Sequence, residues 1–165
     1  MNERLRELYT QKHSADSGYG VTAQRHIVPL QRLAEKRKWK TILDYGCGKG
    51  VLSQHIPEIV NYDFAIPEYC HLPQDNFDAA LCIDVLEHIP ESDLPETLEY
   101  LKGHAGSVFF CIHLGPSLHK LPNGEPCHCT VRPANWWVRE LSAYWSNIEL
   151  VSVNNIHIAV ICNKC

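Results

Sequence analysis

The sequence lacks the features that mark membrane-spanning and secreted proteins. No apolar run among its 165 residues is long enough to cross a bilayer. Residues 1–6 are charged where a signal peptide would begin its apolar core. The net charge of −4 provides no excess of positive charge for nucleic acid or an anionic membrane. We therefore expect a cytoplasmic protein with no membrane span and no general electrostatic attraction to DNA or RNA.

Internal repeats, linkers and low-complexity tracts are missing too, so we expect a single domain over 1–165. We divide it into an N-terminal helical cap (1–40) and a core (41–165). Hydrophobic residues make up 45% and charged residues 21% of the chain, which is an ordinary globular composition. Because no secretion signal accompanies the eight cysteines, we expect them to be mostly reduced thiols.

Apolar runs alternate along the chain with segments of helical character. We expect strands at 41–45, 58–62, 78–83, 107–113, 148–153 and 156–162, the last two forming a hairpin around Asn154-Asn155. We expect helices at 22–39, 51–55, 91–102 (with Ser92 as N-cap) and 134–145, and a short helix within 1–20. Residues 65–76 and 114–133 are expected to be loops. This order predicts an α/β fold with a doubly wound, mostly parallel sheet and an antiparallel C-terminal hairpin.

A glycine-rich turn follows the first strand. Asp44 precedes three glycines at alternate positions, Gly46, Gly48 and Gly50. Such turns between strand and helix bind nucleotide-like ligands in open α/β sheets. A carboxylate at this point would repel a pyrophosphate but attract a cationic amino-acid group. The alternative is a tight turn without a ligand.

Asp44 and the three glycines closely resemble motif I of the Rossmann-like, class I S-adenosylmethionine-dependent methyltransferases. Residues 81–88 resemble the strand-four motif of small-molecule and lipid O-methyltransferases. They do not resemble the Asn/Asp-Pro-Pro-Tyr box of enzymes that methylate base nitrogens, which argues against a DNA acceptor. The chain is also similar to short methyltransferase-domain proteins of bacteriophage and bacteria, with Leu121–Gly124 and Trp136-Trp137 among the shared features. The resemblance implies a Rossmann-like sheet abbreviated between strands two and four.

The resemblance also implies a set of cofactor-binding residues. Asp63 follows the first motif by about 20 residues, the spacing of an acid that binds ribose hydroxyls. Phe64 is expected against the adenine or sugar, and a segment containing Tyr9 often covers the cofactor in this superfamily. The predicted cofactor residues are His13, Tyr19, Asp44, Gly46, Cys47, Gly48, Gly50, Asp63, Phe64 and Asp84. The alternatives are a solvated loop aspartate and plain aromatic packing.

Asp84, Glu87 and His88 resemble the metal-binding motif of ubiquinone O-methyltransferases and of small-RNA 3′-terminal 2′-O-methyltransferases. Those families have Glu where this chain has Asp84, and His128 matches their additional histidine. Two carboxylates and two imidazoles suit Mg²⁺, Mn²⁺ or Fe²⁺. Such a metal would lower the pKa of an acceptor hydroxyl. In the alternative without metal, Asp84 contacts the cofactor while Glu87 and His88 cap the next helix.

A hydroxyl acceptor must lose a proton during the attack on the methyl group. Imidazole titrates near neutrality, so His113, His119 and His128 are candidate bases. We place His128 and His113 in the catalytic set.

The cysteines offer a weaker hypothesis, a structural zinc site. Cys127-x-Cys129 and Cys162-x-x-Cys165 could together supply four thiolates. The first pair is spaced more tightly than zinc sites usually are, so the sequence favours free thiols.

The sequence thus favours a methyltransferase acting on an oxygen of a small molecule or lipid. The first alternative is an RNA 2′-O-methyltransferase, drawing on His128 and on the basic residues within Lys36–Lys40. The second is a non-catalytic protein that binds S-adenosylmethionine. The acceptor must be held by residues 1–20, by the 114–135 loop, or by a partner chain, and no pattern indicates an oligomeric state.

Overall fold

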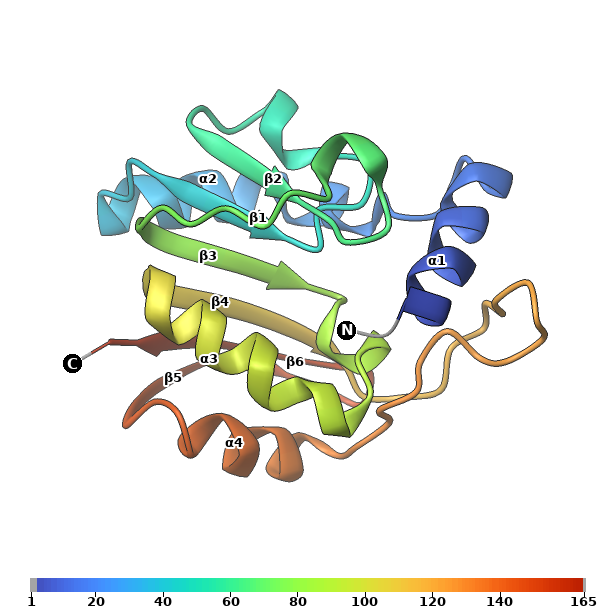
Figure 1. The fold of residues 1–165 in the computed structure, drawn as a ribbon. Helices are drawn as coiled ribbons and strands as arrows, with labels where there is room; N and C mark the ends of the chain where they lie inside the picture. Colours follow the sequence, from blue (N-terminus) through green and yellow to red (C-terminus); the bar gives the residue numbers. More distant parts are fainter. Residues whose placement is uncertain (1–2, 165) are drawn as a thin grey trace.

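The computed structural model describes residues 3–164 and contains one six-stranded sheet in the order β2-β1-β3-β4-β6-β5 (Figure 1). The strands are β1 (Ile42–Tyr45), β2 (Ile59–Tyr62), β3 (Phe77–Ile83), β4 (Ala105–His113), β5 (Asn147–Val153) and β6 (His157–Asn163). Strands β1 to β4 pair in parallel. Strand β6 is antiparallel to β4 and forms a hairpin with β5. The predicted doubly wound sheet with an antiparallel C-terminal hairpin is confirmed.

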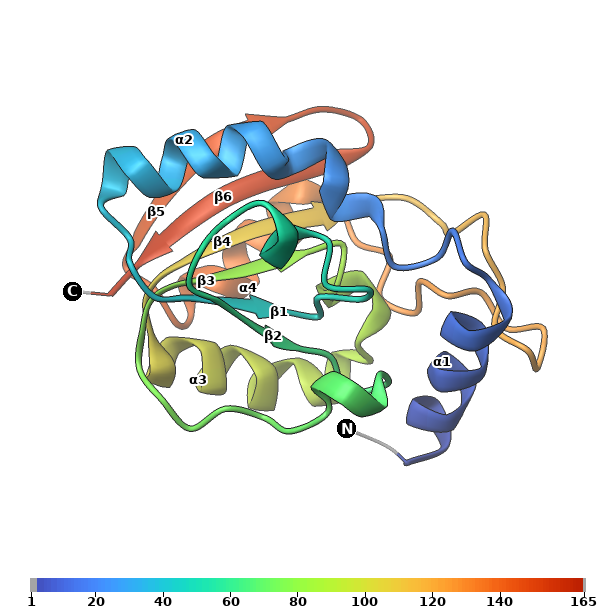
Figure 2. The same ribbon diagram turned by 90° about the horizontal axis from the view of Figure 1, so that it is seen from above.

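Two apolar cores cover the two faces of the sheet (Figure 2). Helix α2 (Ile27–Arg37) packs on one face, and helices α3 (Leu94–His104) and α4 (Ala134–Ser142) pack on the other. Strand β3 serves both cores, because alternate residues of a strand point to opposite faces. Ala80 and Cys82 join the core of α3 and α4, while Leu81 and Ile83 join the core of α2. Such a strand reads as a continuous apolar run.

Several predicted helices are shorter than the sequence indicated. The helix predicted at 22–39 is a 3-10 turn at Thr22–His26 followed by α2, which ends where Lys38 adopts a left-handed φ of 59°. The helix predicted at 51–55 is only a 3-10 turn at Leu52–Gln54. Pro57 follows closely, and a proline disfavours helical backbone in the residue before it.

The start of α3 also differs from the prediction. A 3-10 turn at Glu91–Asp93 precedes the helix, and Pro95 occupies its first turn, where a missing N–H costs nothing. The prediction of Ser92 as N-cap is wrong, because its hydroxyl donates to the Asp93 carboxylate over 2.8 Å. Helix α4 ends at Ser142, before the predicted boundary at residue 145.

The predicted abbreviation after β2 is confirmed. Residues 63–76 contain a single 3-10 turn, Pro67–Tyr69, and no strand. Helix α1 (Glu3–Ala15) stands apart from the two layers, beside the edge of the sheet where β1 and β3 end (Figure 1). Within residues 3–164, no helix is long and apolar enough to cross a bilayer.

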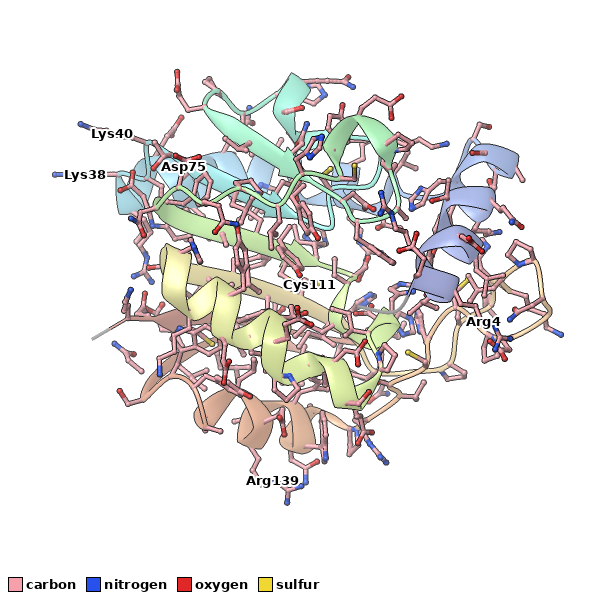
Figure 3. The ribbon with its side chains drawn as sticks, viewed as in Figure 1. Arg4, Lys38, Lys40, Asp75, Cys111 and Arg139 are labelled. Atoms are coloured by element: carbon pink, nitrogen blue, oxygen red, sulfur yellow. The ribbon has the colours of Figure 1, made fainter. Side chains whose placement is uncertain are left out.

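The parallel strands bring the predicted site residues to one edge. The glycine turn follows β1, Asp84 follows β3, and the loop containing His128 follows β4. Strand β6 begins at the same edge, with His157 opposite His113. Figure 3 places Lys38 and Lys40 at the other side of the molecule from Arg4 of α1. The basic segment is therefore remote from the edge that carries the predicted site.

Candidate functional site

A cavity of 460 Å³ opens at this edge, between the glycine turn, α1 and the loop that follows β4. Most of the predicted site residues line it. Its wall includes Gly46, Asp63, Phe64, His88, His128 and His157.

The glycine turn has the backbone that its sequence requires. Gly46, Gly48 and Gly50 have φ values of 77°, 54° and 65°, in the left-handed region that favours glycine. The amides of Gly46 and Cys47 donate to the carbonyl of Tyr62, over 2.8 and 3.0 Å. A Cβ on Gly48 would collide with the backbone of Gly20. The turn is thus locked between the end of β2 and the loop before α2.

Asp44 has an unpartnered carboxylate oxygen in a buried position. The residue is 2% exposed, and Oδ2 has no hydrogen-bond partner. Burial, the larger cause, and the nearby charge of Asp63 together raise the pKa of this carboxyl to about 7. A cationic group placed against Oδ2 would favour the ionised form. Asp44 is not among the residues that line the cavity, so its contact with the amino group of the cofactor stays a prediction.

Asp63 supports the turn from the end of β2. Its Oδ2 accepts from the Gly48 amide over 2.9 Å and its Oδ1 accepts from the Ala65 amide over 3.0 Å. Each carboxylate oxygen retains a second lone pair, so hydroxyl groups of a ribose can still donate to it. Phe64 lines the cavity beside it and meets Tyr9 edge-on, with ring centroids 5.8 Å apart.

The end of α1 and the segment after it close the cavity from the N-terminal side. His13 and Tyr19 both line the cavity, in edge contact with centroids 4.9 Å apart. The Lys49 ammonium donates to the carbonyls of Asp16 and Ser17, over 2.9 and 2.8 Å, and fastens this segment to the glycine turn.

Glu87, His88 and His128 converge on one wall of the cavity. Each offers a ligand atom, and these atoms lie within 4.8 Å of one another. Glu87 is fully buried; its Oε1 accepts from the His113 amide over 3.0 Å, whereas Oε2 has no partner. Burial and the neighbouring Asp84 raise the pKa of Glu87 well above its usual range. A cation would compensate the charge of this carboxylate.

The hydrogen bonds of the two imidazoles determine their tautomers. Nδ1 of His88 lies 3.0 Å from the Cys127 carbonyl, and Nδ1 of His128 lies 2.8 Å from the Gly115 carbonyl. A carbonyl only accepts, so both Nδ1 atoms carry the hydrogen and both Nε2 atoms keep a lone pair. Burial lowers the pKa of both rings, that of His88 to about 3, which keeps them neutral. Histidine ligands of metals are typically oriented by a backbone carbonyl in this way.

These three side chains therefore fit a divalent metal: one buried carboxylate with an unused oxygen and two neutral imidazoles with free Nε2 atoms. The alternative in which Glu87 and His88 cap the next helix is not what the structure contains. Their side chains bond to His113 and to the Cys127 carbonyl, and α3 begins only at Leu94.

Asp84 does not join this group, contrary to the prediction of a fourth ligand. Its backbone turns into the left-handed region with φ 52°. The carboxylate then pairs with Arg25, over 2.7 Å, and its other oxygen lies 3.5 Å from Nε2 of His157. Aspartate is also shorter than the glutamate of the resembling motif. Asp84 nevertheless lines the cavity, as its predicted cofactor role requires.

Sequence reasoning missed Arg25 and His157, which both line the cavity. Arg25 lies on a 3-10 turn 59 residues before its partner Asp84, and no local pattern marks such a pair. His157 had a usable signal, because the pairing of β4 with the hairpin places it opposite His113. The two rings are in edge contact, with centroids 4.8 Å apart. The His113 ring also touches that of His128, at 4.8 Å.

The cysteines lie in separate places. Cys127 is buried in a small cluster with Tyr9 and Leu121, beyond the carboxyl end of β4. Cys162 pairs with Val108, in the first half of that strand. No cysteine among residues 3–164 belongs to a metal-ligand group. Cys165, the remaining predicted zinc ligand, lies outside the described residues.

Residues 23–158 match the methyltransferase domain family. The chain belongs to this methyltransferase family. The match includes the glycine turn, Asp63 and the Glu87, His88 and His128 group. S-adenosylmethionine is accordingly the methyl donor of the enzyme. No curated protein matches the sequence.

Solved structures with the same fold include a methyltransferase with bound S-adenosylhomocysteine and another protein with bound SAH. A complex of DhpI with SAH has a TM-score of 0.72 at 16% identity, covering 99% of this chain and 98% of that one. The 1,6-didemethyltoxoflavin-N1-methyltransferase of Burkholderia thailandensis, with bound 1,6-didemethyltoxoflavin and S-adenosylhomocysteine, has a TM-score of 0.68 at 13% identity, covering 97% and 87%. The methyltransferase domain of bacterial CtHen1 has a TM-score of 0.61 at 14% identity, covering 87% and 100%.

Proposed function

We propose that this methyltransferase transfers the methyl group to a hydroxyl oxygen of a small molecule, with help from a divalent metal held by Glu87, His88 and His128. The observation that carries the proposal is the convergence of these three ligand atoms within 4.8 Å of one another. They lie in the wall of the cofactor cavity, where an acceptor would meet the methyl group.

The position of the basic residues, away from the cavity, favours a small acceptor over RNA. The cavity of 460 Å³, which must also hold the methyl donor, lies within the range of about 300–1,000 Å³ that is usual for small-ligand sites. The basic residues that motivated an RNA acceptor lie at the end of α2 and just after it, and Arg37 among them is paired with Glu149. The end of α2 leads into the start of β1, and the glycine turn lies at the opposite end of that strand.

The residues of the chain divide the work between orientation and proton transfer. The glycine turn, Asp44 and Asp63 orient the donor, whose sulfonium already carries an activated methyl group, so alignment supplies much of the rate. A metal held by Glu87, His88 and His128 would lower the pKa of the acceptor hydroxyl. His113, whose ring touches His128, is then the candidate base.

The test is a methyl-transfer assay on the purified enzyme with S-adenosylmethionine and Mn²⁺ or Mg²⁺. The acceptors are hydroxylated small molecules, lipids with a free hydroxyl, and a short RNA, and mass spectrometry detects the products. We expect an O-methylated small molecule and loss of turnover on chelation. Glu87→Gln should reduce kcat/KM about a hundredfold or more, since a metal stabilises the transition state by several kcal/mol.

Glu99→Gln is the matched control, because Glu99 is an exposed carboxylate on α3. It should leave turnover unchanged. Turnover that survives both chelation and Glu87→Gln would refute the metal. A product formed only with RNA or only with lipid would refute the small-molecule acceptor.

A further inference from the structure

Tyr9 reaches the proposed metal ligands from outside the sheet. It belongs to α1 and is 4% exposed. Its hydroxyl donates to the Cys127 carbonyl over 2.7 Å and lies 3.0 Å from Nδ1 of His88.

The Tyr9 hydroxyl, the Cys127 carbonyl and Nδ1 of His88 lie within hydrogen-bond distance of one another. Tyr9 donates to the carbonyl, so its oxygen is left to accept, and the hydrogen on Nδ1 of His88 can reach both oxygens. The ring of Tyr9 also stands edge-on to that of His88, at 5.7 Å and 81°. The hydroxyl therefore limits the tautomer, and the ring limits the rotation, of His88.

We propose that Tyr9 is a positioning residue, which holds His88 in the Nδ1-protonated tautomer with Nε2 directed at Glu87 and His128. This inference rests on the proposed function in so far as it assigns His88 to a metal. The arrangement itself belongs to the metal-free protein, so it can be tested without the metal.

The consequence concerns the role of α1. Tyr9 is a residue of the N-terminal cap, yet it completes the orientation of a ligand that follows β3. Cys127, on the loop after β4, supplies the shared carbonyl. Two segments far apart in sequence thus fix one imidazole on a third.

The experiment compares Tyr9→Phe with Tyr100→Phe in the full chain. Both variants remove a tyrosine hydroxyl that donates to a backbone carbonyl over 2.7 Å, and Tyr100 bonds to Pro73, away from the cavity. Nitrogen-15 NMR of the metal-free protein at pH 7.5 reports the tautomer of His88, assigned by comparison with His88→Gln. Calorimetry with Mn²⁺ alone and with S-adenosylhomocysteine alone reports the two affinities.

We expect a single Nδ1-protonated signal for His88 in the wild type and in Tyr100→Phe. In Tyr9→Phe the Cys127 carbonyl remains as an acceptor for Nδ1, so we expect a mixture of tautomers in which the Nδ1-protonated form is the larger part. The Mn²⁺ dissociation constant of Tyr9→Phe should rise about tenfold, as for other residues that orient metal ligands. The affinity for S-adenosylhomocysteine should change far less, which shows that the variant is folded.

Two results would overturn the inference: an Nε2-protonated His88 in the wild type, or the same tautomer and Mn²⁺ affinity in Tyr9→Phe as in the wild type. A wild type that binds no Mn²⁺ would instead refute the metal in the proposed function. The NMR comparison would still decide the role of Tyr9.

Discussion

At the scale of single residues, Asp44 gives a pH-dependent prediction. Its pKa is raised from 3.8 to about 7 in the folded protein, so between these pH values the folded state holds a proton that the unfolded state has lost. Without cofactor, the contribution of Asp44 to stability therefore falls as pH rises from about 4 to 7. Asp44→Asn stays neutral, so its stability relative to wild type should increase over this interval, by about 4 kcal/mol at most.

Urea unfolding at a series of pH values measures this difference in stability. The titration of Glu87 also changes stability with pH, but it contributes equally to both proteins and drops out of the difference. The same variant should bind S-adenosylhomocysteine at least about tenfold more weakly, since it loses a charge-assisted hydrogen bond. Asp75→Asn, in an exposed loop, is the control for both measurements. A stability difference that is flat with pH would contradict the burial of an ionisable Asp44.

The sequence predicts the position of a site residue when that residue belongs to a local motif. It does not predict the position of a residue that is placed by contacts with distant parts of the chain. The glycine turn, Asp63 and the Glu87-His88 pair follow strand ends, so topology alone brings them to one edge. The orientation of Asp84 depends on a left-handed backbone and on Arg25, which is distant in sequence. The resemblance predicted a metal ligand there, and the ion pair takes its place.

At the scale of elements, two glycines in different settings give opposite predictions. Gly48 has a left-handed φ and no room for a Cβ, which would lie 2.9 Å from Cα of Gly20. Gly48→Ala should lower the free energy of unfolding by about 1–3 kcal/mol and weaken binding of S-adenosylhomocysteine. Gly103 lies in α3 with nothing near its Cβ position. Gly103→Ala should raise stability by about 0.5–1 kcal/mol, because alanine favours helix.

Urea unfolding of both variants checks the pair, with calorimetry for the cofactor product. Equal effects of the two substitutions would contradict the backbone geometry of the turn.

The helices and strands also divide into those that the sequence predicted well and those that it did not. Strands β3 and β4 are long apolar runs buried on both faces, so their pattern was sufficient. The helix predicted at 51–55 is only a 3-10 turn in the structure. It lies between the glycine turn and Pro57, where the chain must already turn toward β2. Helix ends depend on such neighbours, which hydrophobic periodicity does not register.

At the scale of the whole molecule, α1 joins the cofactor pocket to the proposed metal ligands. The Thr10 hydroxyl donates to the Ala65 carbonyl over 2.8 Å, just after Asp63. On the preceding residue, Tyr9 contacts both Phe64 and His88. Any ligand that orders the Asp63 loop therefore also steadies His88 through one helix. Two sites that stabilise the same element bind cooperatively, and the coupling is reciprocal.

We therefore expect S-adenosylhomocysteine to tighten Mn²⁺ binding about fivefold or more, and Mn²⁺ to tighten S-adenosylhomocysteine by the same factor. Thr10→Val keeps the shape of the side chain but removes the bond to Ala65, so it should reduce this factor toward one. Ser14→Ala removes a hydroxyl that bonds only within α1, to the Thr10 carbonyl, and should preserve the coupling. Calorimetry of each ligand with and without the other measures the factor in all three proteins. Independent binding of the two ligands in the wild type would mean that α1 covers the site without coupling the cofactor pocket to the proposed metal ligands.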